Sequence, residues 1–175
     1  VTENADRKAK KIIANINNKF PNTKIVVLGC YAQLKPEEIS KIKGVEKVIG
    51  AFDKFDISKI IPSHDNENMN FNINVVDDFN ITYSGNERTR AFVKIQDGCN
   101  YNCTYCTIPL ARGKSRNGTI DETINEIIQL TNKGFKEIVL SGINIGDFGF
   151  ETNENLYMLL KKIENIKNLD RYRIS

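Results

Sequence analysis

The sequence contains no tryptophan, a single histidine and only four cysteines among its 175 residues. It also lacks an apolar run of about 18 residues, which a membrane-spanning helix requires, and it has no signal-peptide pattern. We therefore expect a soluble protein of the cytoplasm with no membrane partner. A hydrophobic content of 40% and a charged content of 27% argue against global disorder. The formal net charge of +3 permits a nucleic-acid partner without indicating one.

Three of the four cysteines lie within eight residues, as Cys99, Cys103 and Cys106. Thiolates this close repel one another unless a cation lies between them, and zinc or an iron-sulfur cluster supplies that cation. On a [4Fe-4S] cluster, three cysteines leave the fourth iron open to a small molecule. The spacing favours this cluster.

Two other kinds of protein remain as alternatives. A structural zinc module needs a fourth ligand, for which Cys30 and His64 are the candidates. A ferredoxin-like electron carrier needs four cysteines for each cluster, and the count of three in this loop speaks against it. The identity of the bound metal separates these alternatives from the enzyme.

Helical and strand patterns alternate along the first 62 residues. Apolar spacing predicts a helix over 2–20, strands over 24–28 and 45–49, and short helices from Pro36 to Ile42 and over 53–61. This α/β order predicts a small parallel sheet in an N-terminal domain. Residues 63–89 are rich in Asn, Asp, Ser and Glu, and they predict a linker that holds an edge strand around residues 71–75.

Residues 90–175 predict repeated strand-then-helix units, with strands over 91–95, 137–140 and 172–174. Thr119 and Glu122 form a capping-box pattern, which predicts the start of a helix between the first and second of these strands. Such units form part of a barrel or an open parallel sheet, in which reactive groups lie on loops at the carboxyl ends of the strands. We therefore expect the loops Cys99–Cys106 and Ser141–Asn144 to open onto the same rim.

The cysteine loop and its flanks resemble a known family. CxxxCxxC after a strand, with Tyr105 before the last cysteine, resembles the signature of radical S-adenosylmethionine (SAM) enzymes. The flanking residues 90–99 and 108–116 resemble the methylthiotransferases within that superfamily. Residues 141–149 are similar to the branch that modifies threonylcarbamoyladenosine in tRNA.

The resemblance implies a partial TIM-barrel radical SAM domain in residues 90–175, preceded by part of the N-terminal methylthiotransferase domain. Cys99, Cys103 and Cys106 would bind a [4Fe-4S] cluster whose open iron chelates SAM, and an electron from the cluster would cleave SAM to a 5'-deoxyadenosyl radical. Ser141, Gly142 and Asn144 would contact SAM. Tyr105 would stack near the adenine or pack the loop. No catalytic residue is singled out.

Cys30 is implied to have a separate role. Residues 28–33 match the family segment that carries the last of three cysteines for a second [4Fe-4S] cluster, and residues 1–5 resemble the segment just after the second of them. The sequence starts without Met and stops inside a predicted strand, so we expect a fragment that lacks two of these ligands and is inactive alone.

The full-length enzyme would carry two clusters and methylthiolate C2 of N6-threonylcarbamoyladenosine next to the anticodon. Its partners would be the tRNA anticodon loop and a reducing electron-transfer protein. The same chemistry on isopentenyladenosine is an alternative. A short basic run, Arg112, Lys114 and Arg116, would lie near the RNA. The alternative is a solvated charged loop, which is the more common role of such a run. The sequence has no tryptophan that would add evidence for RNA binding.

Overall fold

Helix α1 (Glu3–Lys19) occupies the segment predicted from its apolar spacing. Its N-cap is Thr2, whose Oγ1 accepts a hydrogen bond from the Ala5 amide at 3.3 Å. Acidic Glu3 and Asp6 in the first turn and Lys19 in the last turn suit the helix dipole. The side chain of Ile13 is buried, so one face of the helix points toward the interior. The helix predicted over 2–20 is therefore confirmed.

The computed structural model describes residues 2–50, 79–85 and 89–175. These residues fall into two units, the first drawn from 1–76 and 102–113 and the second from 77–101 and 114–175. The predicted helix over 53–61 and the predicted edge strand around 71–75 lie outside the described residues. The boundaries at 62 and 90 therefore stay predictions. Within the described ranges, no helix is both long and apolar enough to cross a bilayer.

The first unit contains a two-stranded parallel sheet, as predicted. Strand β1 (Ile25–Leu28) pairs with β2 (Val45–Ile49). Between them lie α2 (Cys30–Leu34), which was not predicted, and α3 (Pro36–Ser40), which has proline in its first turn. The core of this unit consists of the buried residues Tyr31, Ala32, Ile39 and Val48.

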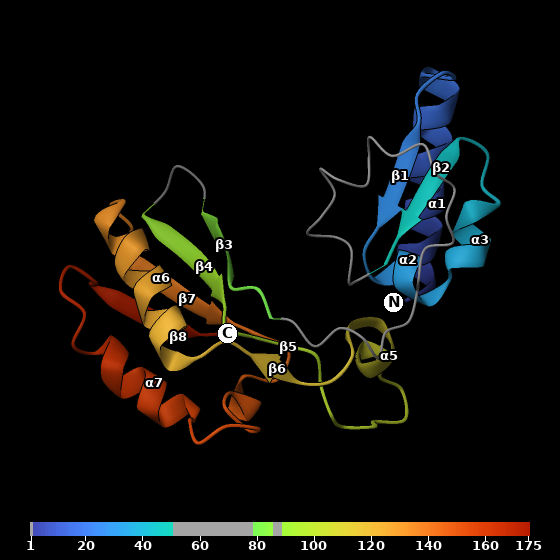
Figure 1. Cartoon of the computed structure of the whole chain (residues 1–175). Coiled ribbons are helices and arrows are strands. Elements are labelled where there is room, and N and C mark those ends of the chain that lie inside the picture. The colour runs from blue at the N-terminus through green and yellow to red at the C-terminus, as the bar shows by residue number, and fades with distance from the viewer. Residues whose placement is uncertain (1, 51–78, 86–88) are drawn as a thin grey trace. The chain divides into compact units, whose positions relative to one another are not determined.

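The second unit is organised by a four-stranded sheet in the order β3-β4-β7-β8 (Figure 1). Strands β4 (Arg90–Lys94), β7 (Glu137–Ser141) and β8 (Arg171–Ile174) are parallel, as the repeated strand-then-helix pattern predicted. Strand β3 (Thr82–Gly85) pairs antiparallel with β4. It lies within the range predicted to be linker, so part of that range belongs to the sheet.

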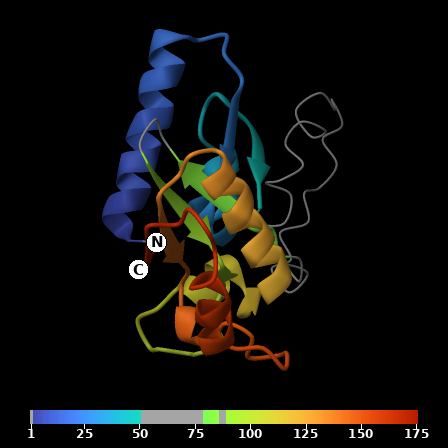
Figure 2. The same ribbon diagram turned by 90° about the vertical axis from the view of Figure 1, so that its left-hand side faces the viewer.

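Two helices cover one face of this sheet, as both views show (Figures 1 and 2). Helix α6 (Ile120–Asn132) begins at the predicted capping box, where Thr119 and Glu122 bond reciprocally. Helix α7 (Leu156–Ile163) begins at Asn155, whose side chain accepts from the Met158 amide at 2.9 Å. Helices and strands together bury the core residues Ala91, Val93, Ile95, Ile120, Ile127, Leu130, Ile138, Leu140, Ile145, Phe148, Leu159 and Ile163.

Four further short elements occur along the chain after β4, and none of them was predicted. Strand β5 (Gln96–Asp97) pairs antiparallel with β6 (Arg116–Asn117). Helix α5 (Ile108–Arg112) belongs to the first unit, and the 3-10 helix η3 (Ile145–Asp147) follows β7. Unlike the equally short β1, β2, β4 and β7, these elements lack an apolar run, so their sequence pattern does not reveal them.

A buried carboxylate joins the three parallel strands at their amino ends. Glu137 is paired in register with Arg90 on β4 and Arg171 on β8. Arg90 Nε lies 3.2 Å from one Glu137 oxygen, Arg173 Nη1 lies 3.7 Å from the same oxygen, and Arg171 donates to the other. The hydrogen bond from Arg171, aided by the arginine charges, lowers the pKa of Glu137 below its ordinary 4.5, against the opposing effect of burial.

This lowered pKa predicts acid lability of the second unit. The stabilisation by ionised Glu137 is complete above its unfolded pKa and is lost as pH falls through the lower folded pKa, because the unfolded chain then binds the proton more readily. In Glu137→Gln, the free energy of unfolding should be smaller at neutral pH and should decrease less on acidification. Urea unfolding at a series of pH values below 6 measures this. Glu151→Gln, at an exposed position, should keep the wild-type slope; an equal slope in both variants would contradict the prediction.

Candidate cofactor site

The root of the cysteine loop is fixed by a buried aspartate. Asp97 Oδ1 accepts from the Gly98 amide at 2.9 Å, and Gly98 adopts a left-handed φ of +72° that favours glycine. Asp97 Oδ2 lies 3.4 Å from Lys94 Nζ and 3.5 Å from Arg116 Nη2. The two cations offset the burial of a carboxylate whose side chain is only 2% exposed. The chain therefore leaves β5 toward Cys99 in a defined direction.

Residues on either side of Cys99 are held to the second unit. Asn100 Oδ1 accepts from the Ser115 amide at 2.9 Å, and the Tyr101 hydroxyl lies 3.5 Å from the buried carboxylate of Asp147. Cys99 itself is half-buried. This first thiol is thus carried by a backbone that is anchored both before and after it.

Cys103 and Cys106 belong to the first unit and share one tight turn. The Cys106 amide donates to the Cys103 carbonyl at 3.0 Å, which closes a turn of four residues. Cys103 is exposed and Cys106 is half-buried. Helix α5, with Pro109 in its first turn, follows directly. The two-residue gap between these cysteines therefore corresponds to a single backbone turn.

The thiols fit an iron-sulfur cluster in their chemistry. All four cysteines are free, so none is consumed by a disulfide, and thiolates are the ligands that such clusters use. Across residues 2–50, 79–85 and 89–175, no three His, Cys, Asp or Glu side chains are gathered as ligands of one metal ion. The three-cysteine site therefore stays a prediction that rests on the donor set and its spacing.

The turn after β7 lies beside the root of the cysteine loop, because β4 and β7 are parallel neighbours. Ser141 Oγ donates to the Val93 carbonyl at 3.2 Å, and the amides of Ile143 and Asn144 donate to Gln96 Oε1 at 2.9 and 2.8 Å. The predicted common rim is confirmed for the part of the loop that belongs to the second unit. Gln96 was not among the predicted site residues. The only feature of the sequence that could have indicated it is a polar residue directly after the apolar strand predicted over 91–95.

Gly142 is required by the protein's own packing. A Cβ at this position would lie 2.9 Å from Ile145 Cγ1 and 3.0 Å from Gln96 Oε1, closer than real Cβ atoms approach their neighbours without displacement. The family resemblance implies that Gly142 contacts SAM, which a glycine permits by close backbone approach. The structure gives another reason for glycine here, which is that the Gln96 side chain lies against it.

Tyr105 and the basic residues after the cysteines differ in how far they are exposed. Tyr105 is 92% exposed, so its ring does not pack the loop, and stacking near an adenine stays the remaining prediction. Arg116 turns toward Asp97 and donates to the Lys114 carbonyl at 3.1 Å, with a side chain only 12% exposed. Arg116 is thus part of the fold rather than a solvated cation. Lys114 is exposed, and Arg112 ends α5.

Cys30 begins α2, directly after Gly29 at the end of β1. Gly29 adopts a left-handed φ of +110°, which turns the chain from the strand into the helix. Hydrogen bonds of neighbouring residues hold this helix: Lys35 binds buried Asp6 at 2.8 Å, and the Tyr31 hydroxyl donates to Glu38 at 3.1 Å. Cys30 is half-buried and belongs to the same unit as Cys103 and Cys106.

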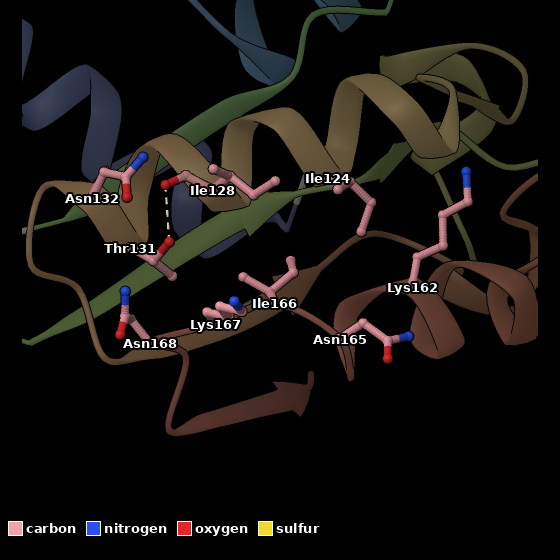
Figure 3. Close-up of a pocket in the computed structure, with 9 residues that line it drawn as sticks. All are labelled: Ile124, Ile128, Thr131, Asn132, Lys162, Asn165, Ile166, Lys167 and Asn168. Atoms are coloured by element: carbon pink, nitrogen blue, oxygen red, sulfur yellow. Dashed lines mark hydrogen bonds between the residues drawn. The ribbon is translucent and has the colours of Figure 1, made fainter.

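A surface groove of about 500 Å³ lies elsewhere in the second unit, between α6 and the segment after α7 (Figure 3). Its walls include Ile124, Ile128 and Ile166, and Thr131 on α6 donates to the Ile128 carbonyl at 2.9 Å. None of the predicted site residues lines it. Because it is on the helical side of the sheet, the groove is separate from the loops at the carboxyl ends of the strands.

Two family models match the chain in separate parts. Residues 93–175 match the Radical SAM superfamily, and residues 1–50 match the uncharacterized protein family UPF0004. The first match contains Cys99, Cys103 and Cys106 and the turn Ser141–Asn144. The second contains Cys30.

Curated relatives match over the length of the chain. A threonylcarbamoyladenosine tRNA methylthiotransferase MtaB from Aquifex aeolicus is 34% identical over 100% of this chain and 44% of its own length, and one from Thermotoga maritima is 36% identical over 100% and 41%. A tRNA-2-methylthio-N(6)-dimethylallyladenosine synthase from Thermodesulfovibrio yellowstonii is 34% identical over 92% and 38%. The chain thus spans less than half the length of these relatives. Residues 93–175 are therefore similar to the Radical SAM superfamily, and the whole chain is similar to the methylthiotransferases.

Proposed function

We propose that this chain is part of a tRNA methylthiotransferase that uses radical SAM chemistry to place a methylthio group at C2 of N6-threonylcarbamoyladenosine next to the anticodon. The observation that carries the proposal is that the root of the cysteine loop, just before Cys99, follows the carboxyl end of β4 and is bonded to the turn after β7. That is where parallel-sheet enzymes place reactive groups. The relatives named MtaB support the choice of nucleoside.

Cys99, Cys103 and Cys106 would hold a [4Fe-4S] cluster with one open iron. When bound, this cluster supplies the electron that cleaves SAM reductively, and the protein contributes binding, orientation and exclusion of water. Ser141, Gly142 and Asn144 would contact SAM at the rim. The exposed ring of Tyr105 is free to stack on an adenine.

Cys30 would serve a second [4Fe-4S] cluster in the full-length protein, which makes two clusters in all. It would share that cluster with two further cysteines, since one thiolate cannot hold it. The partners we propose are the anticodon loop of tRNA, whose unstacked bases an enzyme can receive, and a reducing electron-transfer protein. We place the protein in the cytoplasm with no membrane partner.

Electron paramagnetic resonance of the reconstituted chain tests the cofactor part of this proposal. The 175-residue chain would be loaded with iron and sulfide without oxygen, reduced, and recorded before and after addition of SAM. We expect a [4Fe-4S] signal that SAM changes, because SAM would bind the open iron. A chain that takes up zinc tightly and no cluster would instead be a structural zinc module. A cluster signal unchanged by SAM would indicate an electron carrier.

Isopentenyladenosine is the second candidate substrate. The relative from Thermodesulfovibrio yellowstonii, whose name states the dimethylallyl nucleoside, is as similar in sequence as the MtaB of Aquifex aeolicus, although it matches 92% of the chain rather than all of it. Mass spectrometry of nucleosides from tRNA of cells with and without the gene distinguishes the two. Loss of the methylthio group from threonylcarbamoyladenosine alone would support the proposal, and loss from isopentenyladenosine would replace it.

A further inference from the structure

Gln96 is a fully buried polar side chain at the junction of three segments of the second unit. It has no exposed surface, and it is the first residue of β5, two residues after the end of β4 and three residues before Cys99. A buried amide is costly unless its hydrogen bonds are made. The partners of Gln96 therefore indicate what the residue does.

The nitrogen of the Gln96 amide holds the root of the cysteine loop. Nε2 donates to the carbonyls of Asp97 at 3.0 Å and Gly98 at 2.9 Å, and Ser115 Oγ lies 2.9 Å away. Asp97 and Gly98 are the two residues immediately before Cys99, and Ser115 precedes β6. The donor half of the amide thus joins the outgoing and returning ends of the loop.

The oxygen of the same amide holds the turn after β7. Oε1 accepts from the amides of Ile143 at 2.9 Å and Asn144 at 2.8 Å, which uses both of its lone pairs. The orientation of the amide is unambiguous, because backbone N–H groups only donate and backbone carbonyls only accept. In the reversed orientation, the amide nitrogen of Gln96 would face the N–H groups of Ile143 and Asn144, and its oxygen would face the carbonyls of Asp97 and Gly98.

Glutamine is suited to this position because one neutral side chain carries both functions. A glutamate would keep the acceptor half but would face the carbonyls of Asp97 and Gly98 with a second acceptor, close to the carboxylate of Asp97.

We propose that Gln96 is a positioning residue that couples the loop carrying Cys99 to the turn Ile143–Asn144. Its amide sets the distance between the two segments, so that a cofactor held by the cysteine loop meets the turn in a fixed position. The consequence for SAM rests on the function proposed above. The coupling of the two segments is a property of the chain without any cofactor.

The test compares Gln96→Met, which keeps a similar side-chain length, with Gln129→Met on the exposed face of α6. In the cluster-free chain, hydrogen exchange of the Ile143 and Asn144 amides should become at least about tenfold faster in Gln96→Met, because both lose their acceptor. After reconstitution, iron content should match the wild type, whereas the dissociation constant for SAM should rise about tenfold. Gln129→Met should change neither quantity.

A second variant tests the acceptor half of the amide apart from the donor half. It also replaces Gln96→Met in the test if that variant does not fold. Gln96→Glu keeps an acceptor for Ile143 and Asn144, so their exchange should stay near that of the wild type, while SAM affinity should fall because the loop root is released. Wild-type SAM affinity in a folded Gln96 variant would overturn the coupling to SAM. Unchanged exchange in Gln96→Met would overturn the role of Gln96 in fixing the turn. Absence of SAM binding by the reconstituted wild type would refute the proposed function instead, and the exchange result would still decide the coupling.

Discussion

A Cys103→Ser chain should fold like the wild type and bind no [4Fe-4S] cluster. Cys103 is exposed, and exposed substitutions usually change the free energy of unfolding by less than about 0.5 kcal/mol. A serine hydroxyl, by contrast, does not replace a thiolate as an iron ligand under neutral conditions, since clusters of this type are held by thiolates. Iron and sulfide content after anaerobic reconstitution, with the reduced-state resonance spectrum, measures the loss.

Cys30→Ser is the matched control for this experiment, because it makes the same chemical change at the one cysteine outside the loop. Its loaded cluster should equal that of the wild type. Equal loading of Cys103→Ser and wild type would refute the three-cysteine site. Loss of metal in Cys30→Ser would point to a four-ligand zinc site that includes Cys30, which is the alternative that the cysteine count left open.

Phe148→Ala should destabilise the second unit by about 3–5 kcal/mol, the range observed when a buried phenylalanine is truncated. Phe148 is 1% exposed and packs in the core with residues of β4, β7, α6 and α7. It comes directly after η3, at the end of the segment that follows Ile143 and Asn144. Urea unfolding followed through the amide signals of β4 and β7 measures the change.

Phe150→Ala provides the control two residues away. Its ring is 70% exposed, so the same truncation removes little buried surface and should change the free energy of unfolding by less than about 0.5 kcal/mol. Similar losses in both variants would mean that the loop after η3, rather than the core, determines the stability. A small loss in Phe148→Ala would contradict the core assignment itself.

The sequence by itself determined the regular elements with long enough patterns. The apolar period of α1 and the apolar runs of β1, β2, β4 and β7 placed these elements within one or two residues of their observed bounds. Thr119 and Glu122 marked the start of α6 because a capping box depends only on neighbours in the chain. The three cysteines were equally visible, since their significance rests on spacing and donor chemistry.

Only the tertiary structure decided what the remaining polar residues do. Gln96 and Arg116 are ordinary polar residues in the sequence, and besides near neighbours they bond to partners that lie 19 to 48 positions away in the chain. Strand β3 was hidden in a polar segment because its pairing with β4 depends on a neighbouring strand rather than on its own pattern. Local periodicity reports which face of an element is buried, whereas hydrogen bonds between distant segments form only once the sheet has brought its strand ends together. The coupling proposed for Gln96 belongs to this second class.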